Sequence, residues 1–540
     1  MHLNHLAAAV SLACAALSAV TAAQAADTGA QACKTTAECV AQAEKIGASA
    51  GTLNKAADKD PAYTEQFSWL NRINKASIVM LAEEDIVSRE QAAKIAQGVR
   101  HAITQGEQPD GKRPSDVLQI ERIMIDAIGP EASLIHAGRS RQDMYATYRM
   151  ALLRTHVLVY AEAMNRTREH LLRMAGEHVD TLVPAYTNGV QAMPISYAHY
   201  LLAYEASFAR DAQRIRELYA RMNRSAMGTA VLANSSWPLN RERLADLLGF
   251  DGVIENSLDA GQVITYDVPI EAASLMSSGA IRIGAMIEDI HTQYHQTRPW
   301  LLLAESATYG SSAMPQKRNP GLVMRVRETA TDVVGLAHTV TLRAHNVTTG
   351  MTDYKSATDS LGLGQTASEM FARMDRVLEA LVVDKARALE ELEAEWTTSM
   401  ELADTLQRLH QVPFRIGHSF ASMVVSHARK NDIAPRDFPY AEAQRLYGEA
   451  ARKYEWADAE LPVDELNFRA TLSPTDMVRT RVGTGGPQPE EVNRMLQAAR
   501  QTLEQDTQWL RERREAISQA DVRLDAAFDV LADGVSKPAG

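Results

Sequence analysis

The sequence is poor in aromatic residues and cysteines, and its basic residues are outnumbered by acidic ones. Phe, Trp and Tyr make up 6% of the 540 residues, whereas Ala, Leu, Met, Glu and Arg are abundant, which favours helix over sheet. The net charge of −12 argues against nucleic acid as the main partner but allows local basic pockets for anions. The sequence has no cluster of metal ligands and no phosphate-binding glycine loop. We therefore expect neither a metal nor another cofactor.

Charged residues are missing altogether from residues 1–25. An apolar run from Leu6 to Val20 is short for a membrane span, and the segment ends in Ala23-Gln24-Ala25, whose small residues suit signal cleavage. Its N-terminal region carries histidines in place of lysine or arginine. The sequence thus predicts a signal peptide over 1–25 and a periplasmic or secreted mature protein without a membrane-bound part.

Only 3 cysteines are present, and they fit export. Cys14 would leave with the signal peptide. Cys33 and Cys39 remain in the stretch C-K-T-T-A-E-C, where an oxidising compartment would let them close a small disulfide loop. Two free thiols are the alternative, and the sequence leaves the choice open.

From about Glu65 onward, apolar residues recur at helical spacing. The pattern predicts loops at 109–116 and 482–491, and helices over 142–178, 196–223, 268–296, 321–344 and from Pro489 onward. Such long helices need partners for their apolar faces, so we expect an all-α protein with a central bundle and a homo-oligomer built on it. The expected domains are 26–141, helical; 142–390, the central bundle; and 391–540, helical.

Residues 136–143, H-A-G-R-S-R-Q-D, are the first of three candidate functional segments. Arg139, Ser140 and Arg141 precede the long helix, whose N-terminus offers unpaired N–H groups and partial positive charge. Because arginine adds a bidentate fork, the stretch suits a substrate carboxylate. An N-cap serine between two solvated arginines is the alternative interpretation.

The other two segments lie between predicted helices. In P-A-Y-T-N-G-V-Q-A-M-P, residues 184–194, Thr187 and Asn188 offer hydrogen bonds, although a plain turn explains them equally well. In G-S-S-A-M-P-Q-K-R-N-P, residues 310–320, hydroxyls stand beside the cation of Lys317. A segment of this kind can close over an anionic substrate and exclude water. A polar surface loop is the alternative.

Residues 310–320 resemble the signature loop of the fumarase/aspartase superfamily: Gly-Ser-Ser, any residue, Met-Pro, any residue, Lys, any residue, Asn. Residues 136–143 are similar to His-Thr-Gly-Arg-Ser-Arg-Asn-Asp of its argininosuccinate-lyase branch. That branch is also matched, in order, by residues 239–250, 256–260, 401–418 and 485–492. The resemblance covers roughly residues 69–500. It implies a three-domain helical lyase with a homotetrameric core, in which three chains assemble each active site.

The resemblance also implies roles for the matching residues. Ser311 would be the general base, acting as an alkoxide, and Lys317 and Asn319 would hold the carboxylate that becomes the enediolate. The expected catalytic residues are Ser311, Lys317 and Asn188. The expected substrate-binding residues are Ser140, Arg141, Gln142, Thr187, Ser312, Met314 and Asn319.

Three departures from the family pattern concern the leaving group. Asn188 stands where the family has a histidine linked to leaving-group protonation or substrate binding. Because asparagine cannot titrate, any acid must be another residue or water. Gln142 replaces an asparagine. Residues 343–355 replace a stretch that helps to bind the arginine part of argininosuccinate, and only His345, Asn346 and Lys355 echo it.

We therefore expect an exported carbon–nitrogen lyase that acts on a small dicarboxylate. It would split an N-substituted aspartate, argininosuccinate-like or an aminopolycarboxylic acid, into fumarate and an amine by β-elimination. A true argininosuccinate lyase is one alternative. A catalytically silent binding or structural member of the superfamily is another, and a cycloisomerase a third. The leaving amine and the stereochemistry stay open.

Overall fold

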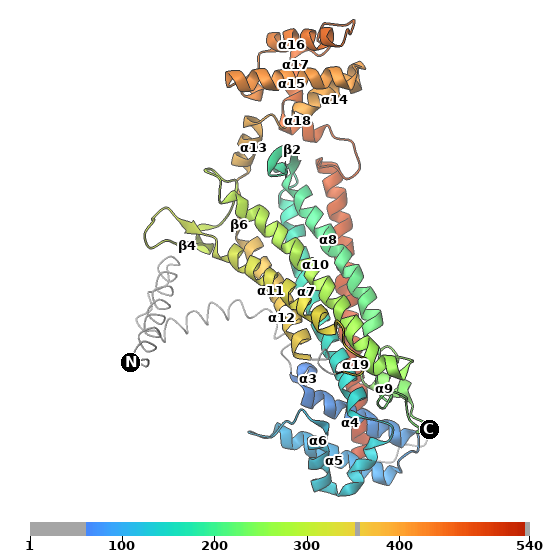
Figure 1. Cartoon of the computed structure of the whole chain (residues 1–540). Coiled ribbons are helices and arrows are strands. Elements are labelled where there is room, and N and C mark those ends of the chain that lie inside the picture. The colour runs from blue at the N-terminus through green and yellow to red at the C-terminus, as the bar shows by residue number, and fades with distance from the viewer. Residues whose placement is uncertain (1–60, 352–356, 535–540) are drawn as a thin grey trace.

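The computed structural model describes residues 61–351 and 357–534, which form an elongated chain built almost entirely of helices (Figure 1). The all-α prediction is confirmed. The predicted signal peptide, Cys33, Cys39 and Lys355 lie outside the described residues.

The N-terminal helices gather at one end of the molecule (Figure 1). They are α3 (Pro61–Thr64), α4 (Gln66–Glu83), α5 (Arg89–Glu107), α6 (Val117–Ile128) and the short 3₁₀ helix η2 (Pro130–His136). Side-chain caps set two of the starts, since Ser88 accepts from the amide of Gln91 and Asp116 accepts from the amide of Leu118. The loop predicted at 109–116 is confirmed between α5 and α6.

Five long helices form the central bundle: α7 (Arg141–Glu177), α8 (Tyr197–Met222), α10 (Ile264–Gln293), α11 (Gly321–Ala344) and α12 (Ala357–Ala380). Most residues of α7 are buried, because it packs against α8 and α12. The predicted helices agree with these bounds except that α10 begins earlier, after a π-helical turn, η3 (Asp259–Val263). Pro269, inside α10, cannot donate to the carbonyl of Thr265, and proline disfavours a helix at this point. The sequence therefore did not predict the residues before Pro269 as part of the helix.

After α13 (Lys385–Ala394), whose Ala388 joins the main core, a second apolar core lies at the other end of the molecule. It is formed within α14 (Ser399–His410), α15 (Phe414–Asn431), α16 (Tyr440–Lys453) and α17 (Glu465–Thr471), with the short helix η6 (Pro435–Asp437) between α15 and α16. After α18 (Pro474–Arg479), α19 (Pro489–Ala532) returns along the whole bundle and packs on α7, α8, α4 and α5. Its residues therefore share the core of the bundle. The domain boundaries predicted from the sequence stay predictions.

Buried and surface ion pairs fasten α19 to the rest of the chain. Buried Arg168 of α7 donates to Glu205 of α8 at 3.0 Å and to Asp506 of α19 at 2.7 Å. Near the C-terminal end of α19, Arg100 of α5 pairs with Asp529 at 2.9 Å and with Asp533 at 2.7 Å. The last helix thus joins the bundle to the N-terminal helices.

Strands are few and short in the described ranges. An antiparallel hairpin is formed by β1 (Leu182–Thr187) and β2 (Val190–Ser196). The small pairs β3 (Leu301–Leu303) with β6 (Leu381–Val383), and β4 (Tyr309–Gly310) with β5 (Arg318–Asn319), are also antiparallel. The remaining short elements are α9 (Arg241–Leu247) and η4 (Glu305–Ala307). The plain turn considered for 184–194 was therefore incomplete, because both flanks of Asn188-Gly189 pair as strands.

One face of α10 and α11 stays uncovered in the single chain; we call it the α10–α11 face. Ile281 is 62% exposed and Leu342 is 70% exposed. Gly284 and Gly335 have no neighbouring atom within 4 Å of an added Cβ. The stretch Asp259–Gln293 is also long and apolar enough to cross a membrane, although half of its apolar window is buried inside the chain.

Candidate active site

Ser140 begins α7 as its N-cap and also ties the helix to a neighbouring loop. Its hydroxyl oxygen accepts from the amide of Gln142 at 3.2 Å and donates to the carbonyl of Ala230 at 2.7 Å. The carboxylate of Asp143 accepts from the amide of Ser140 at 2.8 Å, which completes a capping box. The helix start is therefore held rigidly and presents its N–H groups at a fixed place.

The two arginines beside Ser140 differ in their surroundings. Arg139 is buried and donates to the amide oxygen of Asn74 at 2.9 Å. Burial lowers the pKa of Arg139 to about 10. Arg141 has a side chain that is 55% exposed and donates to Asp116 at 3.0 Å. The alternative of two solvated arginines is thus wrong for Arg139, and only Arg141 is open to a ligand.

Asp143 anchors this end of α7 to a loop that sequence reasoning missed, residues 228–236. Its second carboxylate oxygen accepts from the amide of Gly228 at 3.0 Å. Burial raises the pKa of Asp143 to about 7, against the backbone hydrogen bonds from Ser140 and Gly228. In the same loop Ala230 and Asn234 adopt φ of 53° and 61°. Such strain collects at functional sites, and positive φ at a non-glycine residue leaves no sign in composition or periodicity.

Gln142 points its side chain at the π-helical turn that precedes α10. Its amide nitrogen donates to the carbonyl of Gly261 at 2.6 Å. An added Cβ at Gly261 would lie 3.2 Å from the carbonyl oxygen of Val231, so glycine leaves room for the backbone of loop 228–236. The longer side chain of glutamine, where the family has asparagine, therefore spans from α7 to η3. Its expected contact with a substrate carboxylate stays a prediction.

Thr187 and Asn188 lie at the exposed end of the β1–β2 hairpin, at the far end of α7 from Ser140. Thr187 pairs with Val190, which leaves Asn188 and Gly189 as the two turn residues, at φ of 53° and 78°. Two positive φ values fit a type I′ turn, for which Asn-Gly is the preferred pair. Asn188 therefore has a conformational reason to be asparagine. The N-G pair was the sequence signal that could have identified the hairpin.

Ser311 lies on the signature loop between β4 and β5. Its hydroxyl oxygen accepts from the amides of Ala313 at 3.3 Å and of Met314 at 3.1 Å. Both hydrogen bonds become stronger if the oxygen loses its proton, because a charged acceptor binds N–H groups more tightly. This local turn therefore favours an alkoxide at Ser311.

The rest of the signature loop is exposed and braced across its base. Asn319 donates its amide to the carbonyl of Tyr309 at 3.1 Å, and Arg318 donates to Glu305 at 2.9 Å. Ser312, Met314 and Lys317 are all exposed, with Met314 at 42%. The loop thus offers hydroxyl, amide and cationic groups on one surface, and the base keeps them in place.

The structure of one chain does not bring these three groups together. Ser140, Arg141 and Gln142 lie where α7 begins, whereas Thr187 and Asn188 follow its end. The turn before α10 contacts Gln142, and α10 runs from there toward the end of the bundle that leads to the signature loop. Figure 1 shows the loop carrying β4 projecting away from the bundle. A site made from all three groups therefore needs more than one copy of the chain.

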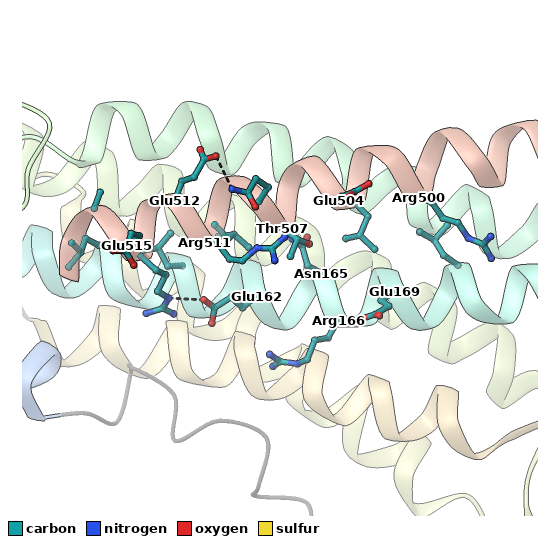
Figure 2. A pocket seen from close by; sticks show the side chains of 18 of the residues that line it. Glu162, Asn165, Arg166, Glu169, Arg500, Glu504, Thr507, Arg511, Glu512 and Glu515 are labelled. Atoms are coloured by element: carbon teal, nitrogen blue, oxygen red, sulfur yellow. Dashed lines mark hydrogen bonds and ion pairs between the residues drawn. The ribbon is translucent and has the colours of Figure 1, made fainter. Parts of the chain in front are cut away.

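A groove with a volume of about 1760 Å³ lies elsewhere, between α7 and α19. Figure 2 shows charged side chains of both signs along it, among them Glu169, Arg500 and Glu504. None of the predicted site residues lines it. Across residues 61–351 and 357–534, no group of at least three His, Cys, Asp or Glu side chains is placed to hold a metal ion.

Residues 61–335 match a protein family described as lyase. The argininosuccinate lyase of Natronomonas pharaonis is 32% identical over 493 residues, which are 88% of this chain and 93% of that protein. The argininosuccinate lyase of Methanosarcina barkeri is 30% identical over 463 residues, 85% of this chain and 90% of that protein.

Solved structures agree with the sequence relatives. EDDS lyase, in complex with formate, has a TM-score of 0.77 and 28% identity, covering 87% of this chain and 92% of its own. A fumarate lyase from Mesorhizobium has a TM-score of 0.62 and 16% identity, covering 82% and 98%. The 3-carboxy-cis,cis-muconate lactonizing enzyme from Pseudomonas putida has a TM-score of 0.61 and 16% identity, covering 83% and 100%. The last two show a likeness of fold alone.

Proposed function

This chain belongs to the fumarase/aspartase superfamily, in its argininosuccinate-lyase-like branch, and we propose that its substrate is an N-substituted aspartate of the aminopolycarboxylic acid class. It is a carbon–nitrogen lyase that releases fumarate. The observation that carries the elimination step is the turn around Ser311, whose hydroxyl oxygen accepts from the amides of Ala313 and Met314. The choice of substrate class rests on Asn188 and on the altered residues 343–355.

In the proposed reaction Ser311 removes a proton from the carbon beside a substrate carboxylate. The electron pair first forms an enediolate on that carboxylate, then the carbon–carbon double bond of fumarate as the carbon–nitrogen bond breaks. A well-placed base contributes about 10²–10⁴-fold to such a step. The two amides that face the oxygen of Ser311 lower the cost of its ionised form.

Lys317 and Asn319 would meet the negative charge of the enediolate as it forms. Both lie within a few residues of Ser311 on a loop whose base is braced by the hydrogen bond from Asn319 to Tyr309. Donors fixed in advance stabilise a transition state by about 3–4 kcal/mol each. Arg141, next to Ser140 at the start of α7, would bind the second carboxylate through its exposed guanidinium in place of Asp116.

Asn188 favours a leaving nitrogen that is already protonated. An alkylamine like that of lysine has a pKa of about 10, so at neutral pH it carries its own proton and leaves as a neutral amine. No titrating residue is then needed at position 188. Aminopolycarboxylic acids contain such amines. The guanidinium of argininosuccinate is also protonated at neutral pH, so we prefer the aminopolycarboxylic acids because residues 343–355 replace the stretch that helps to bind the arginine part.

A homotetramer is proposed because the site residues of one chain lie apart. The α10–α11 face, with exposed Ile281 and Leu342 beside open glycines, has the small and apolar residues that a helix of another copy can pack against. In such an assembly the signature loop of one copy can meet the start of α7 and the hairpin of two others.

Export is the second part of the proposal, since an uncharged apolar N-terminus ends in Ala-Gln-Ala. An exported enzyme would suit scavenging of an aminopolycarboxylic acid. N-terminal sequencing of the protein from the periplasm or medium tests this, and Ala26 is the expected first residue. A retained Met1 on the accumulated protein would contradict it.

Fumarate release by the purified mature protein tests the proposed activity, with absorbance as the readout. The panel contains N-substituted aspartates with alkylamine leaving groups, and argininosuccinate as a separate arm. Turnover of argininosuccinate in preference to the alkylamine compounds supports the second candidate, an argininosuccinate lyase, which the named relatives favour. An inert wild type that still binds succinate would support a silent binding protein instead.

A further inference from the structure

Glu391 of α13 receives hydrogen bonds from both arms of the β1–β2 hairpin. The hydroxyl of Tyr186 donates to its Oε1 at 3.0 Å, and the side-chain amide of Gln191 donates to the same oxygen at 2.6 Å. Arg387, one turn earlier on α13, donates to Oε2 at 3.0 Å. Three donors, from β1, β2 and α13, therefore converge on one carboxylate, and Glu391 is only 6% exposed.

The hairpin needs such a tie because its end is exposed. Every residue from Tyr186 to Val190 is exposed, and Asn188 and Gly189 form a turn without apolar anchors. Tyr186 directly precedes Thr187, and Gln191 directly follows Val190, the pairing partner of Thr187. The two residues that donate to Glu391 thus bracket the segment that carries Thr187.

The carboxylate is itself held from behind. Arg387 donates through Nε to the carbonyl of Arg298 at 2.9 Å, so its guanidinium is fixed between that backbone and Glu391. Burial raises the pKa of Tyr186 to about 12, which keeps its hydroxyl a donor throughout the neutral range. As the three neighbours are placed, each donates to Glu391, which suits a carboxylate that only accepts.

We propose that Glu391 is a positioning residue of the lyase. By accepting hydrogen bonds from Tyr186 and Gln191, it fixes the orientation in which Thr187 contacts the substrate. This inference rests on the proposed function, which gives Thr187 the role of a substrate contact. Glu391 itself touches only protein groups. It acts through the hairpin.

Glu391→Gln is the decisive variant, because it keeps the size of the side chain but replaces one acceptor with a donor. The amide would oppose either the two hairpin donors or Arg387. We expect the KM for an N-substituted aspartate to rise about tenfold while kcat stays within about threefold, because binding through Thr187 would weaken equally in the ground state and the transition state.

The neighbouring Glu390 supplies a matched control. It is a glutamate on the same helix, bound to Arg298 at 2.7 and 3.0 Å, and it makes no hydrogen bond to the hairpin. Glu390→Gln should leave KM unchanged. If Glu391→Gln folds poorly, Tyr186→Phe can be used instead. It removes only the hydrogen bond from Tyr186 to Glu391 and should also raise KM, by a smaller factor.

Two outcomes overturn the inference. One is a KM for Glu391→Gln equal to that of Glu390→Gln. The other is an equal effect of Glu391→Gln in a Thr187→Ala background, where the rise should vanish if the effect passes through Thr187. If the wild type releases no fumarate from any compound of the panel, the proposed function is wrong instead. The succinate concentration needed to protect each variant against thermal unfolding compares Glu391→Gln with Glu390→Gln without turnover. Failure of the inference can therefore be distinguished from failure of the proposed function.

Discussion

Ser140 and Thr187 flank α7 at opposite ends, so 37 residues of continuous helix separate them. At the rise of an α-helix this corresponds to about 55 Å, far beyond the size of any dicarboxylate. Both residues match substrate-binding positions of the family. They can serve one substrate only if different copies of the chain contribute them.

Mixing two inactive variants therefore restores activity. Arg141→Ala and Ser311→Ala remove groups from different parts of the chain, and subunits mixed after mild dissociation should form some sites with both wild-type residues. Random assembly in equal amounts predicts about a quarter of wild-type activity. The rate of fumarate release before and after mixing measures it. Activity no greater than the sum of the separate variants would contradict a shared site.

Ser311→Ala separates chemistry from binding. Without the hydroxyl, kcat should fall by about 10²–10⁴-fold, because the base is lost while Lys317 and Asn319 remain. Succinate should protect the variant against thermal unfolding as it does wild type. Ser312→Ala, at an expected substrate-binding position on the same loop, should instead raise KM and change kcat far less. If Ser311→Ala still turns over the substrate at the wild-type rate, Ser311 is not the general base.

Asp143→Asn should destabilise the fold. One oxygen of Asp143 accepts from the amide of Ser140 at 2.8 Å, the other from the amide of Gly228 at 3.0 Å. An asparagine amide must turn its NH₂ toward one of these donors, which costs about 1–3 kcal/mol of unfolding free energy. Urea unfolding measures the change. Glu169→Gln, an exposed site on the same helix, should stay within about 0.5 kcal/mol of wild type.

His156 makes stability sensitive to acid. It is fully buried in α7, tightly packed against Gly364 of α12, and burial lowers its pKa to about 4. Between pH 6.5 and 4 the unfolded chain binds a proton that the folded chain excludes, so stability is complete above pH 6.5 and falls as the pH drops. The loss is about 2 kcal/mol at pH 5.

His156→Gln isolates this contribution, because glutamine does not titrate. The difference in unfolding free energy between wild type and variant should shrink or reverse as the pH falls from 7 to 5. Urea unfolding at several pH values follows it. A difference that stays constant over this range would show that His156 is not the group responsible.

The helices could be predicted from the sequence because apolar residues recur along them with helical spacing. The signature loop could be identified because Ser311, Lys317 and Asn319 have fixed spacing within one short segment. The burial of Arg139 could not be predicted from the sequence, since it depends on Asn74 of another helix. Nor could the role of loop 228–236, whose backbone is set by contacts with α7 rather than by its own residue types.

The site residues are separated because they lie at opposite ends of α7. A periodic pattern of apolar residues predicts the helix but not where its two ends lie in the fold. The pattern over 142–178 predicts a helix, yet it says nothing about which residues lie beside each end. Glu391 escaped notice for the same reason. A lone glutamate in a charged helix looks like a solvated side chain until the hairpin, 200 residues earlier in the chain, is seen to donate to it.

The return of α19 along the whole bundle has a consequence for biosynthesis. Helix α19 packs against α7 and α8 and forms ion pairs with α5, although it is made more than 250 residues after all three. The nascent polypeptide therefore cannot complete its main core before residues 489–532 have been synthesised. Truncated products that stop before Pro489 should expose that unfinished wall and become substrates for proteolysis, whereas release of the full chain allows the N-terminal and bundle helices to lock together in one late step.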